Sequence, residues 1–295
     1  MRRTILENTS PLVKALCLFS IMLVCSIVCI LVYTILGHGT DISSLRYTQA
    51  LQSIGIFVVP CLIGAALWSQ HPMQWLRLTK MPSWTSIGLT IALIICAIPF
   101  INLLHHYNQQ ITLPEWLSTV EEWMKYNEEN ANNILHQFLA STRYCDLFLN
   151  LFVMAFLPGL SEEILFRGTL QPLLGEQKNA SIAIWCSAFL FSAIHMQFYG
   201  FIPRLLMGAA LGYMAVWSGS LWLPIIGHAI NNAIAVVSYF ICQRLGADSS
   251  VIDSFGTQDT LWAGLLSCIV ISILIYALRR SLTMSNASSR NASGN

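Results

Sequence analysis

The hydrophobic positions of this 295-residue chain fall into long apolar runs rather than into an alternating pattern. A helix that spans a bilayer needs about 20 such residues. Eight runs approach this length, at residues 12–36, 51–69, 85–104, 147–173, 180–199, 203–218, 221–241 and 260–278. The sixth run is short, which leaves the count open by one. Because unsatisfied backbone groups exclude open irregular structure from lipid, the pattern predicts an all-α polytopic membrane protein with about eight transmembrane helices.

Residues 105–146 form the longest polar stretch between these runs. Within it, Trp116, Val120 and Trp123 recur at helical spacing, and acidic residues occupy the other faces. This pattern predicts an amphipathic helix that lies in the membrane interface. A lid over a functional site is the alternative interpretation of the same helix.

The apolar and polar segments divide the chain into five parts. Residues 1–110 hold the N-terminal transmembrane helices, and residues 111–146 form the amphipathic connecting segment. Residues 147–242 form a core in which polar side chains gather inside apolar runs. Residues 243–280 contain the C-terminal transmembrane helix and the loop before it, and residues 281–295 are predicted to be a disordered polar tail.

The composition excludes an ordinary soluble domain. Only 10% of the residues are charged and 55% are hydrophobic, whereas soluble domains carry about 25% charged residues. The net charge of +1 gives no indication of a nucleic-acid partner, and the lipid bilayer is the predicted environment. Basic residues flank the runs on one side of an eight-span arrangement, at Arg2, Arg3, Lys14, Arg77, Lys80, Arg279 and Arg280. The positive-inside rule therefore predicts a multi-pass cell-membrane protein with both termini in the cytoplasm.

Two glutamates and an arginine lie inside the fourth run, where each charge costs about 3 kcal/mol. Glu163 and Arg167 are four residues apart, so they lie about 40° apart on one face of a helix and can pair. Glu162 lies about 140° from Arg167 around the same axis. One glutamate is therefore neutralised by the arginine, and the other is left for a different role.

Two histidines and an asparagine in the following runs can complete a catalytic site with the spare Glu162. His195 ends the stretch "FLFSAIH", and His228 and Asn232 share a helix face. A carboxylate beside a neutral imidazole can hold and deprotonate a water, and a histidine and an amide can donate to an oxyanion. These groups suit hydrolysis of a peptide bond inside the bilayer.

Upright helices would place Glu162 near the middle of the membrane and His195 toward the outer end of its run. A break at Pro158-Gly159, a tilt, or a segment that does not span the membrane must therefore bring these side chains together.

The order of these residues resembles the three motifs of the CPBP family, named for CAAX proteases and bacteriocin-processing enzymes. That family includes type II CAAX prenyl endopeptidases and bacterial abortive-infection proteins. The matching residues are Glu162-Glu163 with Arg167, Phe191 with His195, and His228 with Asn232. The resemblance covers roughly residues 145–242 and implies an all-helical intramembrane core in a bacterial membrane protein.

The resemblance also implies an activity and a role for each motif residue. The chain would be an endopeptidase that cleaves membrane-associated peptides or proteins. Glu162 and His195 would activate the water, and His228 and Asn232 would form the oxyanion site. Structural support would come from Glu163, Arg167 and Phe191.

Three alternatives stay open at this point. Glu162, His195 and His228 could instead bind zinc, with an open water position, although no HExxH motif is present. No cofactor is firmly predicted, and zinc is the alternative. The same charges could form an ion relay in a transporter, although no inverted repeat is found. The chain could also be a non-catalytic immunity or regulatory membrane protein.

Overall fold

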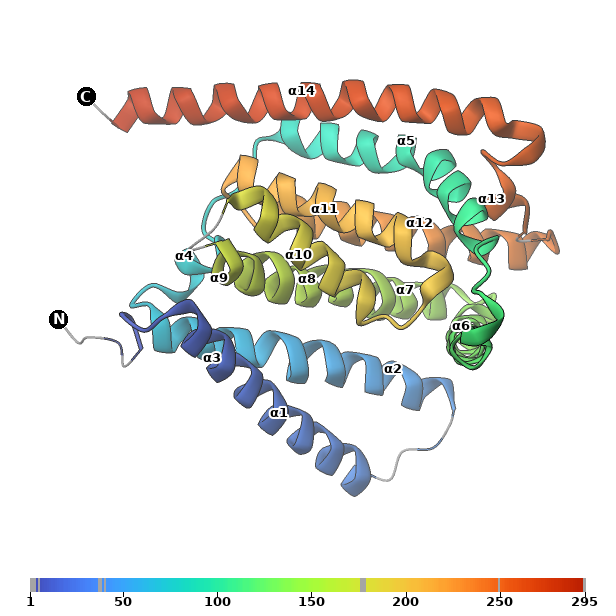
Figure 1. Ribbon diagram of the computed structural model, residues 1–295, viewed down its shortest axis with the longest axis horizontal. Helices are drawn as coiled ribbons and strands as arrows, with labels where there is room; N and C mark the ends of the chain where they lie inside the picture. Colours follow the sequence, from blue (N-terminus) through green and yellow to red (C-terminus); the bar gives the residue numbers. More distant parts are fainter. Residues whose placement is uncertain are drawn as a thin grey trace.

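Long helices that lie side by side along one axis of the molecule make up most of the fold (Figure 1). The computed structural model describes residue 4 and residues 6–36, 39, 41–175, 179–248 and 250–293, with side chains described as far as Met284. Within these ranges the chain contains helices and no strands. The prediction of an all-α polytopic fold is confirmed.

Fourteen α-helices are found in the described residues. They are α1 Pro11–Leu36, α2 Ile42–Leu51, α3 Val59–Trp68, α4 Pro72–Trp75, α5 Trp84–Gln109, α6 Ser118–Leu139, α7 Tyr144–Asn150, α8 Leu157–Glu163, α9 Gln171–Gly175, α10 Ala180–Ala193, α11 Phe201–Ser218, α12 Trp222–Leu245, α13 Ser250–Ser254 and α14 Leu261–Ser293. The π-helical segments are η1 Gln52–Val58, η3 Leu151–Phe156 and η4 Ile164–Leu170, and the 3-10 segments are η2 Glu115–Leu117, η5 Phe198–Gly200 and η6 Gln258–Thr260.

The π-helical segments join short α-helices into long ones. Helices α2 and α3 are continuous through η1, and α7, α8 and α9 are continuous through η3 and η4. The second composite helix, Tyr144–Gly175, carries both glutamates of the fourth run.

Seven helices in the described residues are long and apolar enough to cross a membrane: Pro11–Leu36, Ile42–Trp68, Trp84–Gln109, Tyr144–Gly175, Phe198–Ser218, Trp222–Leu245 and Gln258–Met284. The expectation of a spanning helix over 180–199 is wrong by this measure. Helix α10 has only 14 residues, or about 21 Å at 1.5 Å per residue, and the apolar layer is about 30 Å thick. The run 203–218 is extended at its start to Phe198 and qualifies.

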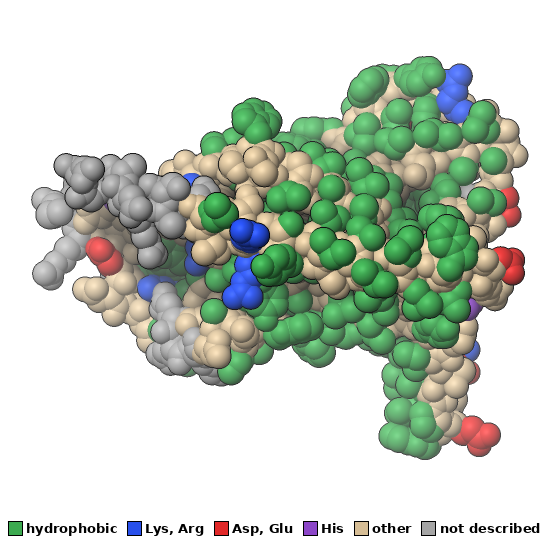
Figure 2. Space-filling model, turned by 90° about the horizontal axis from the view of Figure 1, so that it is seen from above, with side chains coloured by type: hydrophobic (Ala, Val, Ile, Leu, Met, Phe, Trp, Pro, Cys, Tyr) green, Lys and Arg blue, Asp and Glu red, His purple; other side chains and the backbone are tan. Residues whose placement is uncertain are grey.

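The outer surface of the bundle is apolar, as a lipid environment requires. On the face seen in Figure 2, hydrophobic side chains cover the middle of the molecule, and charged side chains gather toward its ends. Helix α1 contributes several of the most exposed apolar side chains, including Leu12, Phe19 and Ile35, with 70%, 65% and 80% of their surface exposed.

Helix α6 crosses one end of the bundle, and both chain termini lie at the opposite end (Figure 1). Its polar and apolar faces are segregated as predicted. Phe138 and Leu139 are buried against Val153 and Val236 of the bundle, whereas Trp116, just before the helix, is 80% exposed. The predicted amphipathic helix is therefore present, and it packs against the helices that carry the polar residues.

The tail beyond residue 280 differs from the prediction, because α14 continues as a helix to Ser293. Leu278 and Leu282 are buried against α5 and α11, which anchors the helix up to this point. Extending a helix that already exists adds one hydrogen bond for each residue fixed and needs no new nucleus. The tail contains no proline, and its only glycine is Gly294, so nothing in the sequence before Gly294 stops this extension.

Close contact between α8 and α12 positions the polar residues. A Cβ atom added at Gly159 would lie 2.9 Å from the backbone nitrogen of Ala229 and 3.0 Å from its Cα. Only glycine permits this approach, which sets Glu162 and Glu163 of α8 beside His228 of α12.

We expect Gly159→Ala to destabilise the protein, although alanine is normally the better helix former. Forcing a methyl group into a packed contact typically costs about 1–3 kcal/mol. Gly88 in α5 is the matched control, because a Cβ there meets nothing within 4 Å. Gly88→Ala should instead stabilise the protein by about 0.5–1 kcal/mol. Thermal unfolding of both variants in the same detergent measures the difference, and a gain in stability for Gly159→Ala would contradict the close contact.

Candidate active site

A fully buried ion pair lies at the centre of the site. Glu163 and Arg167 are both 0% exposed, and the Arg167 Nη1 to Glu163 Oε1 distance is 2.7 Å. Arg167 Nη2 also donates to the backbone oxygen of Gly208 at 2.9 Å, and the guanidinium lies 4.5 Å from the centre of the Phe191 ring. The pairing expected from the four-residue spacing is therefore present, with additional contacts from α10 and α11.

Glu163 also binds His228, which the sequence did not indicate. The Nδ1 atom of His228 lies 2.8 Å from Glu163 Oε1. Because Glu163 forms an ion pair with Arg167 and a carboxylate can only accept, Nδ1 of His228 is the donor. When the His228 ring carries a single proton on Nδ1, its free lone pair therefore lies on Nε2. One glutamate links the arginine on its own helix to a histidine on α12.

His195 is oriented in the same way by a different acceptor. Its Nδ1 lies 2.7 Å from the backbone oxygen of Phe191, one helical turn earlier. A carbonyl oxygen accepts, so Nδ1 is again the donor and Nε2 has the free lone pair. The Phe191 ring contacts both imidazoles edge-to-face, with ring centres 5.0 Å from His195 and 5.7 Å from His228.

Glu162 faces both of these Nε2 atoms. Its Oε2 lies 4.0 Å from Nε2 of His195 and 3.8 Å from Nε2 of His228. This oxygen is buried and has no hydrogen-bond partner among the described residues. Three acceptor atoms that converge in this way repel one another unless a proton donor or a cation lies between them. The geometry thus creates a position for a water molecule or a metal ion.

Asn232 lies on α12, one turn after His228, as its spacing predicts. Its side-chain amide donates to the backbone oxygen of Met154 at 3.3 Å and accepts from Asn231 at 3.3 Å. Asn232 lines a cavity of about 700 Å³ together with Glu162, His195 and His228. All four residues expected from the sequence to be catalytic are therefore brought together.

The short α10 explains how His195 reaches Glu162. This helix ends at Ala193, and the left-handed Met196, with φ of 56°, turns the chain toward α11. Pro158 does not break the composite helix, because it follows the π-helical segment η3, whose wider turns accommodate it. Of the three routes considered from the sequence, the break at Pro158-Gly159 is not found, and the early end of α10 with the turn at Met196 is what brings His195 beside Glu162.

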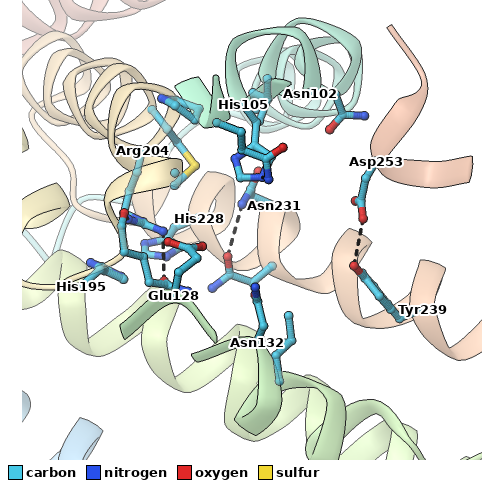
Figure 3. A pocket seen from close by; sticks show the side chains of 18 of the residues that line it. Asn102, His105, Glu128, Asn132, His195, Arg204, His228, Asn231, Tyr239 and Asp253 are labelled. Atoms are coloured by element: carbon cyan, nitrogen blue, oxygen red, sulfur yellow. Dashed lines mark hydrogen bonds between the residues drawn. The ribbon is translucent and has the colours of Figure 1, made fainter. Parts of the chain in front are cut away.

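Several lining residues of the cavity could not be found from the sequence, because they come from distant segments. Figure 3 shows Glu128 and Asn132 from α6 and His105 from α5 facing the same space as His195 and His228. Arg204 of α11 also lines this space, and its guanidinium donates to the backbone and side-chain oxygens of Gln197, each at 3.1 Å. Helix α6 is thus a wall of the cavity as well as an amphipathic helix.

The three candidate zinc ligands are of chemical types that bind zinc, but their side chains lie farther apart than a zinc site requires. Two ligands at about 2.0–2.1 Å in a tetrahedral site lie about 3.3 Å apart. The separations of 3.8 and 4.0 Å between Glu162 and the histidines are wider. Among the described residues, no group of three such side chains is close enough to hold an ion as it stands. The side chains would have to close by about half an ångström to bind zinc.

These features define a class: an all-helical membrane protein with a buried site of carboxylate and imidazole groups. Residues 144–234 match the family model described as type II CAAX prenyl endopeptidase Rce1-like. This range contains all the motif residues, and it confirms the resemblance drawn from the sequence.

A curated relative and the solved structures add little detail. The chain is 31% identical over 94 residues to "Uncharacterized protein YpbD" of Bacillus subtilis (strain 168). The aligned part covers 30% of this chain and 43% of that protein, so the chain spans less than half the length of this relative. No solved structure gives a significant match.

We expect Arg167→Gln and Glu163→Gln each to lower the melting temperature strongly. Either change leaves an uncompensated charge in a fully buried site, which typically costs about 3–5 kcal/mol. The control is Glu121→Gln in α6, which removes a pair of the same four-residue spacing with Lys125, whose side chain is 63% exposed. That pair is worth at most about 1 kcal/mol. Thermal unfolding of the three variants in lipid nanodiscs tests this order, and equal melting temperatures would contradict it.

Proposed function

We propose that this protein is an endopeptidase that hydrolyses a peptide bond in a membrane-associated peptide or protein. The observation that carries the proposal is the convergence of Glu162 Oε2 with the Nε2 atoms of His195 and His228 at one end of a large cavity. The match of residues 144–234 to a peptidase family supports it.

In this mechanism, Glu162 and His195 hold the attacking water. Both present acceptor atoms, so the two hydrogens of one water can point at Glu162 Oε2 and at His195 Nε2. Glu162 then takes one proton as the oxygen attacks the scissile carbonyl carbon, and it returns that proton to the leaving amine. A general base of this kind typically contributes about 10²–10⁴-fold to the rate.

The negative charge that forms on the carbonyl oxygen requires hydrogen-bond donors on the side of the substrate opposite Glu162 and His195. Asn232 supplies its side-chain amide, and His228 can donate from Nε2 when its ring is protonated. The carboxylate of Glu163, 2.8 Å from Nδ1 of His228, stabilises the positive ring, as an aspartate does in serine proteases. Glu163 therefore has a positioning role in catalysis besides its pairing with Arg167.

Zinc held by Glu162, His195 and His228 is the alternative mechanism for the same reaction. A bound zinc would activate the water and polarise the carbonyl. The donor types favour it, since two imidazoles and one carboxylate form a known catalytic set.

We expect Glu162→Gln to abolish cleavage while the folded state is kept. The amide keeps the size of the side chain but cannot take the proton. Glu129→Gln is the control, because Glu129 is an exposed glutamate on α6 that does not line the cavity. Purified proteins in nanodiscs are incubated with a library of membrane peptides, and the products are identified by mass spectrometry. Cleavage by Glu162→Gln at the wild-type rate would overturn the assigned base.

The same preparation separates the two mechanisms. Elemental analysis of the active protein measures its zinc content, and activity is followed during chelation and after zinc is added back. Activity that persists without stoichiometric metal agrees with the water mechanism. Stoichiometric zinc that is lost and regained together with activity would establish the metal mechanism instead.

We further propose that the end of the bundle with both termini faces the cytoplasm and that α6 lies on the outer side. The basic residues after α3 and in α14 support this orientation by the positive-inside rule. Reporter fusions after Asn295 and at Asn130 in α6 should therefore report opposite sides of the membrane. If both fusions report the same side, the proposed orientation is wrong.

A further inference from the structure

The proposed catalytic residues lie at the junction of two cavities. The larger has a volume of about 700 Å³ and the smaller about 490 Å³. Glu162, His195 and Asn232 line both, together with Gln197 and Leu135. An extended peptide whose scissile bond lies at Glu162 would therefore place one side of its chain in each cavity.

The smaller cavity is apolar. Apart from the shared residues and two glutamines of the α2–η1 helix, its lining side chains are hydrophobic. The largest of them are Phe57, Ile134, Phe138, Met154, Pro158 and Ile194. Ile134 and Ile194 are 46% and 49% exposed, so part of their apolar surface is free for a ligand. Among the described lining residues, Glu162 is the only one with a carboxylate, and none is a lysine or arginine.

The larger cavity is polar and negatively charged. Glu128, Asp248 and Asp253 line it in addition to Glu162, and Arg204 is its one lysine or arginine among the described residues. Three carboxylates against one guanidinium give a formal charge of −2 outside Glu162, with neutral histidines. Arg204 donates to two oxygens of Gln197 and lies beside Glu128, so its charge is balanced locally (Figure 3).

The unbalanced carboxylates lie away from the catalytic histidines. Figure 3 shows Asp253 and Tyr239 across the cavity from His195 and His228, and Tyr239 donates to Asp253 at 3.0 Å. The backbone N–H of Ser250 donates to Asp248, and this hydrogen bond lowers the pKa of Asp248 below its usual value. Asp248 is therefore ionised at neutral pH.

We infer that the substrate is a peptide with apolar side chains on one side of the scissile bond and basic side chains on the other. The apolar part occupies the smaller cavity, and lysine or arginine side chains occupy the far part of the larger cavity near Asp253. This inference rests on the proposed peptidase function and adds the class of substrate. Complementary charge favours basic partners over acidic ones, and apolar burial favours leucine or phenylalanine over polar residues.

Binding can be measured without turnover by using the Glu162→Gln variant. Three fluorescent peptides share one apolar half, and their other halves contain two lysines, two glutamines or two glutamates. The protein is held in phosphatidylcholine nanodiscs, which carry no net charge, and binding to empty nanodiscs is subtracted. Each exposed charge pair can change affinity by up to about fivefold, so we expect the lysine peptide to bind at least fivefold more tightly than the glutamate peptide. Raising the salt concentration from 50 to 500 mM should narrow this difference, because the charges are screened.

Variants in each cavity test which half of the peptide binds in which cavity. Asp253→Lys should remove or reverse the preference for lysine, and Asp253→Asn, which keeps a partner for Tyr239, should weaken it. Asp259→Lys is the matched control, since Asp259 is exposed and lies outside both cavities. Ile134→Ser should weaken the binding of all three peptides. Val120→Ser is the control and should not weaken it, because Val120 is a similarly exposed apolar side chain of α6 that lines neither cavity.

The outcomes separate this inference from the proposed function. Equal affinities for the three peptides, or a preference that Asp253→Lys leaves unchanged, would overturn the inference even if the wild-type protein cleaves them. A lysine preference that depends on Asp253 supports the inference. If the wild-type protein then binds the lysine peptide but cleaves none of the set, the proposed function fails and the binding preference stands.

Discussion

The site depends on one constraint: a positive charge without access to solvent must have all its partners in place. The Arg167 guanidinium is fully buried, and it is held by Glu163, by the backbone oxygen of Gly208 and by the face of Phe191. These contacts come from three separate helical segments, so the packing of α10 and α11 around the composite helix is tied to the position of a single charge. Because Glu163 also accepts from His228, the orientation of a ring on α12 depends on the same charge.

Backbone geometry makes this arrangement possible. Gly159 lets α8 approach the backbone of α12, and the short α10 delivers His195 to the depth of Glu162. The two histidines are held in the same way. In each ring Nδ1 donates to an acceptor, and Nε2 faces Glu162. The site therefore arises from helix lengths and close contacts as much as from the identity of its polar residues.

The sequence predicted the helical membrane fold, the Glu163–Arg167 pair and the group of residues around Glu162. The first two rest on local periodicity, namely run length and the four-residue spacing of a helix, whereas the grouping of His195 and His228 with Glu162 rests on the polar residues of successive apolar runs and on the resemblance to the family motifs. The bond from His228 to Glu163 and the contribution of α6 to the cavity were not predictable, since they join residues on different helices that no local spacing relates. The length of α10 was also misjudged, because the apolar run from 180 to 199 continues past the helix end at Ala193 into a turn.

The shared carboxylate of Glu163 limits how this protein can change over time. In many proteins a buried ion pair can be replaced by hydrophobic side chains of similar volume with no loss, and sometimes with a gain, in stability. Here the same replacement would remove the acceptor that fixes the proton on Nδ1 of His228. A more stable apolar core at these two positions would leave the His228 ring free to rotate or to change tautomer. Selection for stability and selection for an ordered imidazole therefore act in opposite directions on one pair of residues.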